Sequence, residues 1–165
     1  MLIQSDVMDI RRTAVEDLDF VLEVEQDELN RHYVAQWSRG QHKASLTDGD
    51  FLHLTMLEKT GERLGYVLIS GLQDRNLAVC LRRIVIQTKG QGYGTALLPL
   101  LTEWIFTQTE AHRLWLDVVI HNHRAQHVYQ MAGFTLEGTL RECLKMGETY
   151  ETMQIMSLLR HEYES

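Results

Sequence analysis

The amino-acid sequence predicts an α+β fold in which helices surround a mostly antiparallel sheet. Residues 51–86 contain three apolar, strand-like runs, the first two of which flank a short turn at 59–62. A glycine-rich stretch, an apolar helical segment and another strand follow as one β-loop-α-β unit, and two strand-like runs around residues 146–148 end the chain. With 165 residues, the sequence fits a single domain over 1–165 that can bury a sizeable core.

The first half of the chain alternates short strands with two helices. A helix is expected over residues 14–30, because apolar side chains recur there at helical spacing with acidic residues between them. A second, shorter helix is expected over 33–38. The expected strands of this half are 9–13, 51–57, 63–70 and 78–86, of which the second and third form an antiparallel hairpin.

The second half contains the clearer helices. One runs from the glycine-rich stretch to about residue 108, and Pro99 is expected to bend it because it removes a hydrogen bond to the carbonyl of Thr95. A strand at 113–119 precedes a helix over 122–132, which Gly133 ends. Strands at 134–143 and 149–159 complete the chain.

Composition and charge exclude several classes of protein. A net charge of −7 disfavours a nucleic-acid-binding surface, which normally carries a basic excess. No apolar run approaches a membrane span, and the N-terminus lacks a basic segment followed by an apolar stretch, so we expect a cytoplasmic protein without membrane contact. Cys80 and Cys143 have no CxxC spacing and lie in apolar strand-like runs, which predicts two buried, reduced thiols.

Three glycines within five residues, Gly90, Gly92 and Gly94, stand directly before a helical segment. Glycine costs a helix roughly 1 kcal/mol relative to alanine, so a sharp turn or a close approach to a ligand explains them better. A helix start has unpaired N–H groups and suits a phosphate. The stretch lacks the GxxxxGK of a P-loop, and Thr95 stands where a dinucleotide fingerprint needs its third glycine. A glycine-rich turn without a ligand is the simpler alternative.

Asn122 and Tyr129 lie seven residues apart, two helical turns, and therefore share one face of the expected helix. Without a ligand, Asn122 would be a plain helix cap and Tyr129 a core aromatic. His121, His123 and His127 cluster nearby, but no Cys or carboxylate completes a ligand set, so no metal site is expected.

Three blocks of the sequence resemble the GNAT superfamily of N-acetyltransferases, which bind acetyl-CoA. QTKGQGYG at 87–94 matches the superfamily's Q/R-x-x-G-x-G/A signature. LWLDVVIHNHRAQHVYQMAGF at 114–134 resembles the strand and helix that follow it. Glu137-Gly138 through Arg141-Glu142 resembles the branch containing the ribosomal-protein N-terminal (alanine) acetyltransferases. The resemblance covers about residues 8–160.

The resemblance implies an α/β/α sandwich whose mixed, mostly antiparallel sheet splays apart at its centre. The coenzyme's pyrophosphate would lie on the N–H groups of the glycine-rich loop, and its pantetheine arm would pair with the backbone of 84–86 like an added strand. Tyr129 would protonate the departing thiolate. The implied coenzyme-binding residues are Ile84, Val85, Ile86, Gln87, Lys89, Gly90, Gln91, Gly92, Tyr93, Gly94, Thr95, Asn122 and Tyr129.

The implied reaction is direct attack of a neutral amine on the thioester carbonyl, with the oxyanion met by a backbone N–H near Val85 or Ile86. It requires neither a nucleophilic cysteine nor a metal. Protein N-termini, polyamines and small-molecule amines all fit as acceptors, and the protein is expected to be a monomer or homodimer. The alternative is a non-catalytic acetyl-CoA-binding regulatory module, against which Tyr129 argues.

The general base and the acceptor pocket are expected near the first helix, where the superfamily's acceptor site lies. Glu25 is the preferred base, with Glu28 and His32 as further candidates, although for any one of them taken alone a solvated helix face is the better explanation. The acceptor-binding residues expected are Glu28, Trp37 and His42. Core packing is the alternative for Trp37, and surface exposure is the alternative for His42.

Overall fold

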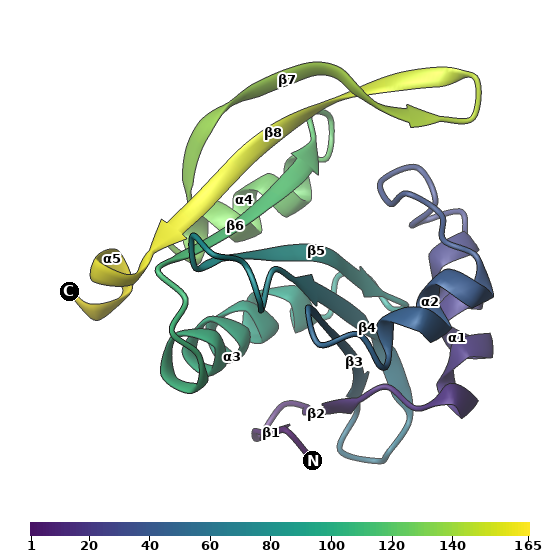
Figure 1. Ribbon diagram of the computed structural model, residues 1–165. Coiled ribbons are helices and arrows are strands. Elements are labelled where there is room, and N and C mark those ends of the chain that lie inside the picture. The colour runs from purple at the N-terminus through teal and green to yellow at the C-terminus, as the bar shows by residue number, and fades with distance from the viewer.

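One eight-stranded sheet runs through the computed structural model, which describes residues 1–165 (Figure 1). The strands lie in the order β1-β2-β3-β4-β5-β6-β8-β7, and every neighbouring pair is antiparallel except β5 and β6. Their bounds are β1 Ile3–Gln4, β2 Asp9–Arg12, β3 Phe51–Leu57, β4 Arg63–Ser70, β5 Ala78–Ile86, β6 Arg113–Val119, β7 Thr135–Met146 and β8 Thr149–Leu159.

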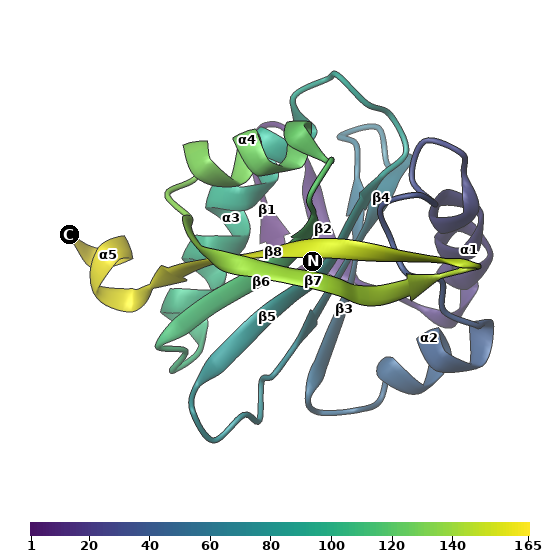
Figure 2. The same ribbon diagram turned by 90° about the horizontal axis from the view of Figure 1, so that it is seen from above.

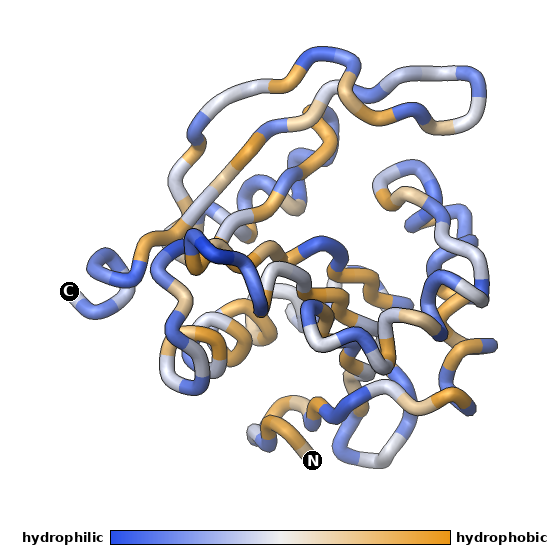
Figure 3. The backbone as a smooth tube through the Cα atoms, in the orientation of Figure 1, coloured by the Kyte–Doolittle hydropathy of each residue, from blue (hydrophilic) through white to orange (hydrophobic).

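Helices cover both faces of this sheet. The 3-10 helix η1 (Val15–Asp17), α1 (Leu18–Gln26) and α2 (Arg39–Ser45) lie on one face, while α3 (Tyr93–Gln108) and α4 (His123–Met131) lie on the other, and α5 (Arg160–Glu164) ends the chain (Figure 2). Apolar residues concentrate in the central strands and in α3 (Figure 3). The larger apolar core lies between the sheet and α3, and a second, smaller one lies between the sheet and α1. The predicted α/β/α sandwich is confirmed.

The two central strands separate soon after they meet. β5 and β6 pair in parallel only over Ala78–Cys80 and Arg113–Trp115, whereas β6 pairs with β8 along its whole length. Beyond Cys80, β5 therefore follows β4 and β6 follows β8, and the sheet opens between them. The prediction of a centrally splayed sheet is confirmed.

A β-bulge at Arg82 changes which side chains of β5 face each layer. Leu68 of β4 lies opposite Arg83 and Ile69 lies opposite Leu81, so Arg82 has no partner. Before the bulge, Leu81 packs into the larger core; after it, Ile84 contacts that core and Val85 belongs to the smaller one. A bulge re-aims the side chains around it. Here it turns Arg83 toward the layer that contains α1.

The prediction of a helix at residues 33–38 is wrong, because the short helix α2 begins at Arg39. Ser38 caps it by accepting from the Gln41 N–H at 3.1 Å, and the Gln41 side chain accepts from the Ser38 N–H at 2.8 Å. This capping box fixes the start of α2, and the preceding residues form a connection. The first predicted helix ends early, at Gln26. The sequence also did not predict β1 and α5, which are short.

The prediction that both cysteines are buried holds for Cys80 but is wrong for Cys143, which is exposed. Cys143 lies on β7, which pairs only with β8 and forms the outer edge of the sheet. No helix covers this arched strand (Figure 1). An apolar stretch in an outer strand thus does not imply burial.

Pro99 lies inside α3, and the helix continues past it, from Tyr93 to Gln108. No helix of the protein is long and apolar enough to cross a membrane.

The buried Asp17 carboxylate joins the segment before α1 to strands β2 and β4 through hydrogen bonds, and we expect these bonds to stabilise the fold. Its carboxylate accepts from both Nη atoms of Arg11 at 2.6 and 3.0 Å, from Arg63 Nε at 2.8 Å and from the Ala14 N–H at 2.8 Å. Burial alone would raise the pKa of Asp17, but these hydrogen bonds outweigh it and hold the pKa well below the usual value.

We expect Asp17→Asn to lower the melting temperature by about 3–10 °C, as losing about 1–3 kcal/mol of charge-assisted hydrogen bonding implies for a chain of this size. Because the folded-state pKa is depressed, the carboxylate stabilises the fold above its unfolded pKa of about 4 and loses this contribution as pH falls further. Thermal denaturation between pH 7 and pH 3 should therefore show a flatter acid dependence in the variant. An unchanged acid dependence would contradict this role.

Candidate active site

A cavity of about 760 Å³ lies where β5 and β6 separate. On the α3 side of the sheet, its lining comes from the glycine-rich loop and the first turns of α3 and α4. On the α1 side, it comes from residues 29–35 and from Cys143, Leu144 and Met153 of the β7–β8 hairpin. The cavity therefore joins both faces of the sheet through the opening between the central strands.

The glycine-rich loop presents unpaired amides to this cavity. Gly90 and Gly92 have φ angles of 75° and 78°, and an added Cβ at either would meet no atom within 4 Å. Their left-handed backbone, not crowding, thus explains the choice of glycine. No N–H of residues 88–92 donates to a backbone carbonyl, and the first amides of α3 lie free beyond them. This cradle of N–H groups at the start of a 16-residue helix suits an anion.

Two cationic side chains stand beside this cradle. Lys89 and Arg124 both line the cavity. Burial, and then the nearby charge of Arg124, lower the pKa of Lys89, while Asp27 acts in the opposite direction. Two cations held together in a partly buried position repel each other. A bound polyanion would relieve that repulsion.

The β5 backbone has free groups along the opening. The Gln87 N–H donates to the Leu64 carbonyl at 2.8 Å, so the alternation of an antiparallel ladder pairs Val85 with Tyr66 and directs the amides of Ile84 and Ile86 toward β6. Ile84 and Ile86 line the cavity. Val85 is fully buried in the smaller core, and neither it nor the exposed Gln87 lines the cavity. Of the two amides expected to meet an oxyanion, only that of Ile86 points into the opening.

The predicted pair on α4, Asn122 and Tyr129, meets the same cavity. Asn122 is the N-cap of α4, and its Oδ1 accepts from the Ala125 N–H at 3.3 Å, so one residue serves as cap and as cavity lining. The Tyr129 ring lies 6.0 Å from the Phe134 ring between centroids. Burial, and then the charge of Asp117, raise the pKa of Tyr129 to about 12, so its hydroxyl keeps its proton at neutral pH.

Asp117 supplies the one carboxylate of the cavity lining. It lies on β6, and burial raises its pKa while the charge of Arg82 opposes that shift. A carboxylate with a raised pKa near a phenol with a raised pKa is an arrangement that acid–base chemistry uses. Our sequence analysis did not single out Asp117. In the sequence, Asp117 stands out as an acidic residue within the otherwise apolar run that follows Arg113 in the strand 113–119. Trp115, two residues earlier, lines the same cavity.

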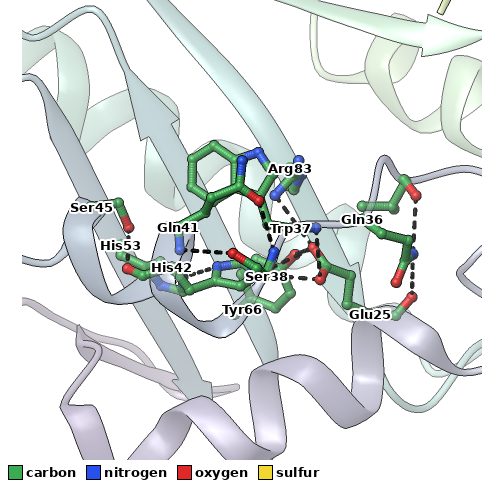
Figure 4. Close-up of polar contacts among 11 residues, drawn as sticks. Glu25, Gln36, Trp37, Ser38, Gln41, His42, Ser45, His53, Tyr66 and Arg83 are labelled. Atoms are coloured by element: carbon green, nitrogen blue, oxygen red, sulfur yellow. Dashed lines mark hydrogen bonds and ion pairs between the residues drawn. The ribbon is translucent and has the colours of Figure 1, made fainter. Parts of the chain in front are cut away.

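Glu25 lies behind the cavity wall and does not line it. It is fully buried and accepts from Tyr66 Oη at 2.8 Å, His42 Nε2 at 3.2 Å, Arg83 Nη1 at 3.3 Å and the Trp37 N–H at 3.4 Å (Figure 4). With four donors around it, this carboxylate has no open side for an acceptor amine. The geometry therefore disfavours Glu25 as the general base.

The other residues expected at the acceptor site divide into two groups. Trp37 and His42 lie beside Glu25, and neither lines the cavity. Trp37 is half-buried and His42 is fully buried. Glu28 and His32 are exposed, and Glu28 pairs with Arg31 at 3.6 Å. No group of three or more His, Cys, Asp or Glu side chains is arranged to hold a metal ion.

Comparisons with known proteins relate this chain to acetyltransferases. A family model described as the acetyltransferase (GNAT) family matches residues 13–134. A candidate ribosomal protein bS18-alanine N-acetyltransferase of Bacillus subtilis (strain 168) is 27% identical over 128 residues, 75% of this chain and 78% of that protein. The spermidine N(1)-acetyltransferase of Vibrio cholerae serotype O1 is 29% identical over 80 residues, which span only 48% of this chain and 46% of that enzyme.

Solved structures show that the fold is shared. The crystal structure of the Vibrio cholerae spermidine N-acetyltransferase in complex with CoA and spermine superposes with a TM-score of 0.86. The two chains are 19% identical, and the alignment covers 98% of this chain and all of the other. At that identity the likeness establishes the arrangement of strands and helices. The residues of the cavity have to be judged by their own chemistry.

Proposed function

The chain belongs to the acetyltransferase (GNAT) family, and we propose that it transfers the acetyl group of acetyl-CoA to a primary amine within the cavity between β5 and β6. The observation that carries this proposal is the lining itself. An anion-binding cradle lies at one end of the cavity, free strand amides lie along its middle, and an acid–base pair of Tyr129 and Asp117 stands where the sheet opens.

The coenzyme would occupy the α3 side of the cavity. Its pyrophosphate fits the amides of residues 88–95, with Lys89 and Arg124 as counter-charges. The pantetheine arm fits the free amides of Ile84 and Ile86, and Asn122 would contact it from α4. Of the residues expected to bind the coenzyme, Val85 and Gln87 are absent from the lining and would support the loop indirectly.

Three groups of the chain would divide the chemical work. Asp117 would take the proton of the acceptor amine, directly or through a water molecule, because it is the carboxylate that the cavity exposes. The Ile86 N–H would stabilise the oxyanion as the amine nitrogen bonds to the thioester carbon. Tyr129 would give its proton to the thiolate as the carbon–sulfur bond breaks, leaving an amide and free CoA thiol.

Cys80 has no part in this scheme as a nucleophile. Burial, and then the charge of Asp117, raise the pKa of the Cys80 thiol to about 12, so it remains protonated and weakly nucleophilic at neutral pH. Direct transfer from coenzyme to amine therefore fits the cavity better than an acyl-cysteine intermediate.

We expect acetyl-CoA to raise the melting temperature of the protein. At one hundred times its dissociation constant, a ligand stabilises the fold by about 2.7 kcal/mol, equivalent to roughly 5–11 °C for a chain of this size. Thermal denaturation with and without millimolar acetyl-CoA checks this, and free adenosine at the same concentration is the control. A folded sample without any shift would contradict the proposed coenzyme site.

Release of free thiol in the presence of a panel of amines tests the transfer reaction itself. Acetyl transfer requires thiol release that depends on both the amine and the protein, with the acetylated amine as the second product. A protein that binds acetyl-CoA but releases thiol with no amine would be a coenzyme-binding regulatory module instead.

A further inference from the structure

The cavity lining carries an excess of positive charge. It contains four cationic side chains, those of Arg82, Arg83, Lys89 and Arg124, and the single carboxylate of Asp117. Lys89 and Arg124 stand at the glycine-rich loop, where the proposed function already supplies the phosphates of the coenzyme. Arg82 and Arg83 lie on β5 at the bulge, and the Arg83 guanidinium lies over the Trp37 ring on the side of α1. Their charge has no partner in the coenzyme-binding scheme.

Arg83 is buried and held in one position. Its Nη1 donates to Glu25 Oε1 at 3.3 Å, and its guanidinium carbon lies 4.4 Å from the centroid of the Trp37 ring. These contacts fix one edge and one face of the guanidinium (Figure 4). Nε and Nη2 make no hydrogen bond within the protein, and Arg83 belongs to the cavity lining. The guanidinium therefore has donors available for a ligand.

A buried chain of hydrogen bonds holds the Glu25 side chain in place beneath Arg83. Besides Tyr66 and the Trp37 N–H, it is contacted by His42, whose Nδ1 lies 3.1 Å from His53 Nε2. Burial, and then the charges of His42 and Arg83, lower the pKa of His53 to about 3, so His53 is neutral. The network thus holds the Glu25 carboxylate and the Arg83 guanidinium against each other. Such a fully satisfied network rigidifies the group that it supports.

Arg82 adds a second cation at the same wall. As the bulged residue it has no partner on β4, its side chain is exposed, and it makes no ion pair within 4.0 Å. The charge of Asp117 acts on Arg82 only from a greater distance. Two neighbouring residues of β5 thus bring guanidinium groups with open donors to the cavity lining, and Arg83 does so from the α1 side, opposite the proposed coenzyme site.

We infer that the acceptor is an amine that carries a carboxylate, such as a small amino acid, and that Arg83 and Arg82 bind this carboxylate. Guanidinium groups match carboxylates in geometry and charge. A polyamine would instead bring additional positive charge to a wall that already has two cations, and like charges oppose binding. The inference rests on the proposed function. It assigns Glu25, Trp37 and His42 a positioning role behind Arg83.

Matched pairs of acceptors test the inference. α-Amino acids and ω-amino carboxylates of increasing chain length would each be compared with their own carboxamide, and with spermidine, by thiol release. We expect kcat/KM for the preferred carboxylate to exceed that for its carboxamide by about ten- to one-hundred-fold, the range for hydrogen bonds to a charged group. Equal rates for carboxylate and carboxamide, or spermidine as the best acceptor, would overturn the inference and leave acetyl transfer intact.

Variants identify the arginines responsible. Arg83→Gln and Arg82→Gln should each lower the ratio of kcat/KM for the carboxylate to kcat/KM for its carboxamide by about tenfold or more, and this ratio is the readout because either change can also alter the rate with the carboxamide. Arg75→Gln, at an exposed arginine outside the cavity, is the matched control and should keep the full preference. Arg82 is exposed, so its replacement keeps the test valid if Arg83→Gln does not fold. A preference unchanged in both variants would overturn the assignment.

A binding measurement separates this inference from the proposed function. The same amino carboxylates and carboxamides would be titrated calorimetrically into protein saturated with CoA, which needs no turnover. Tighter binding of carboxylates, without thiol release from any amine, would support the anion site and contradict acetyl transfer. No difference in binding between carboxylates and carboxamides would overturn the anion site.

Discussion

Replacing Asp117 by Asn is expected to lower kcat/KM by about 10²–10⁴-fold at neutral pH, the usual contribution of a positioned general base. Asn keeps the size of the side chain but cannot take a proton from the acceptor amine. Asp117 is the one carboxylate that lines the cavity, so no second carboxylate of the lining can replace it. The melting temperature should change little, because Asp117 makes no ion pair within 4.0 Å.

The pH profile gives the sharper test of Asp117. Burial raises its pKa, so the wild-type rate should fall as pH decreases through a value above the ordinary pKa of about 4 for an aspartate. In Asp117→Asn this acid limb should disappear, and only the ionisation of the amine itself should remain. Glu110→Gln, at an exposed residue outside the cavity, is the control. A wild-type acid limb in the Asp117 variant would remove Asp117 from the mechanism.

Local sequence patterns were sufficient for most of the sheet and for the glycine-rich loop. The strands at 51–57, 63–70 and 78–86 were predicted with the bounds that the structure shows, because their apolar runs end at turn residues. The loop was recognisable because positive φ angles at Gly90 and Gly92 leave a direct mark on residue choice.

Features set by contacts between distant segments escaped prediction. The sequence suggested Glu25 as a general base, with a solvated helix face as the alternative, but its partners Tyr66 and Arg83 lie 41 and 58 residues away, and nothing near it in the chain indicates them. The bulge at Arg82 depends on register with β4. The exposure of Cys143 depends on the outer position of β7. Local periodicity predicts which side chains of a strand share a face, but the neighbouring strands and helices determine which residues each side chain contacts.

The capping box at Ser38 was a local signal that sequence analysis missed. Ser38 and Gln41 have the spacing of a helix start, and they place α2 six residues after the predicted position at 33–38. The shift has a functional consequence. It allows His42, within α2, to reach Glu25, and it leaves Trp37 in the preceding connection to stack on Arg83.

Replacing Tyr129 by Phe is expected to lower turnover by at least about tenfold, and by up to 10⁴-fold if departure of the thiolate limits the rate. The hydroxyl keeps its proton up to a pH near its raised pKa of about 12, so it is available as an acid throughout the working range. Phe retains the packing of the ring against Phe134, and affinity for acetyl-CoA and the melting temperature should stay nearly unchanged.

Varying the acyl donor separates this role of Tyr129 from a structural one. A thioester whose thiol has a lower pKa needs less protonation as it leaves, so the loss of rate in Tyr129→Phe should shrink with such donors. Tyr163→Phe, in which the replaced tyrosine stacks on Phe106 away from the cavity, is the matched control. A tyrosine that only packs would lower stability and leave turnover per folded molecule independent of the donor. Because the charge of Asp117 acts on Tyr129, losses from the double variant should also be less than multiplicative if both act in one proton-transfer sequence.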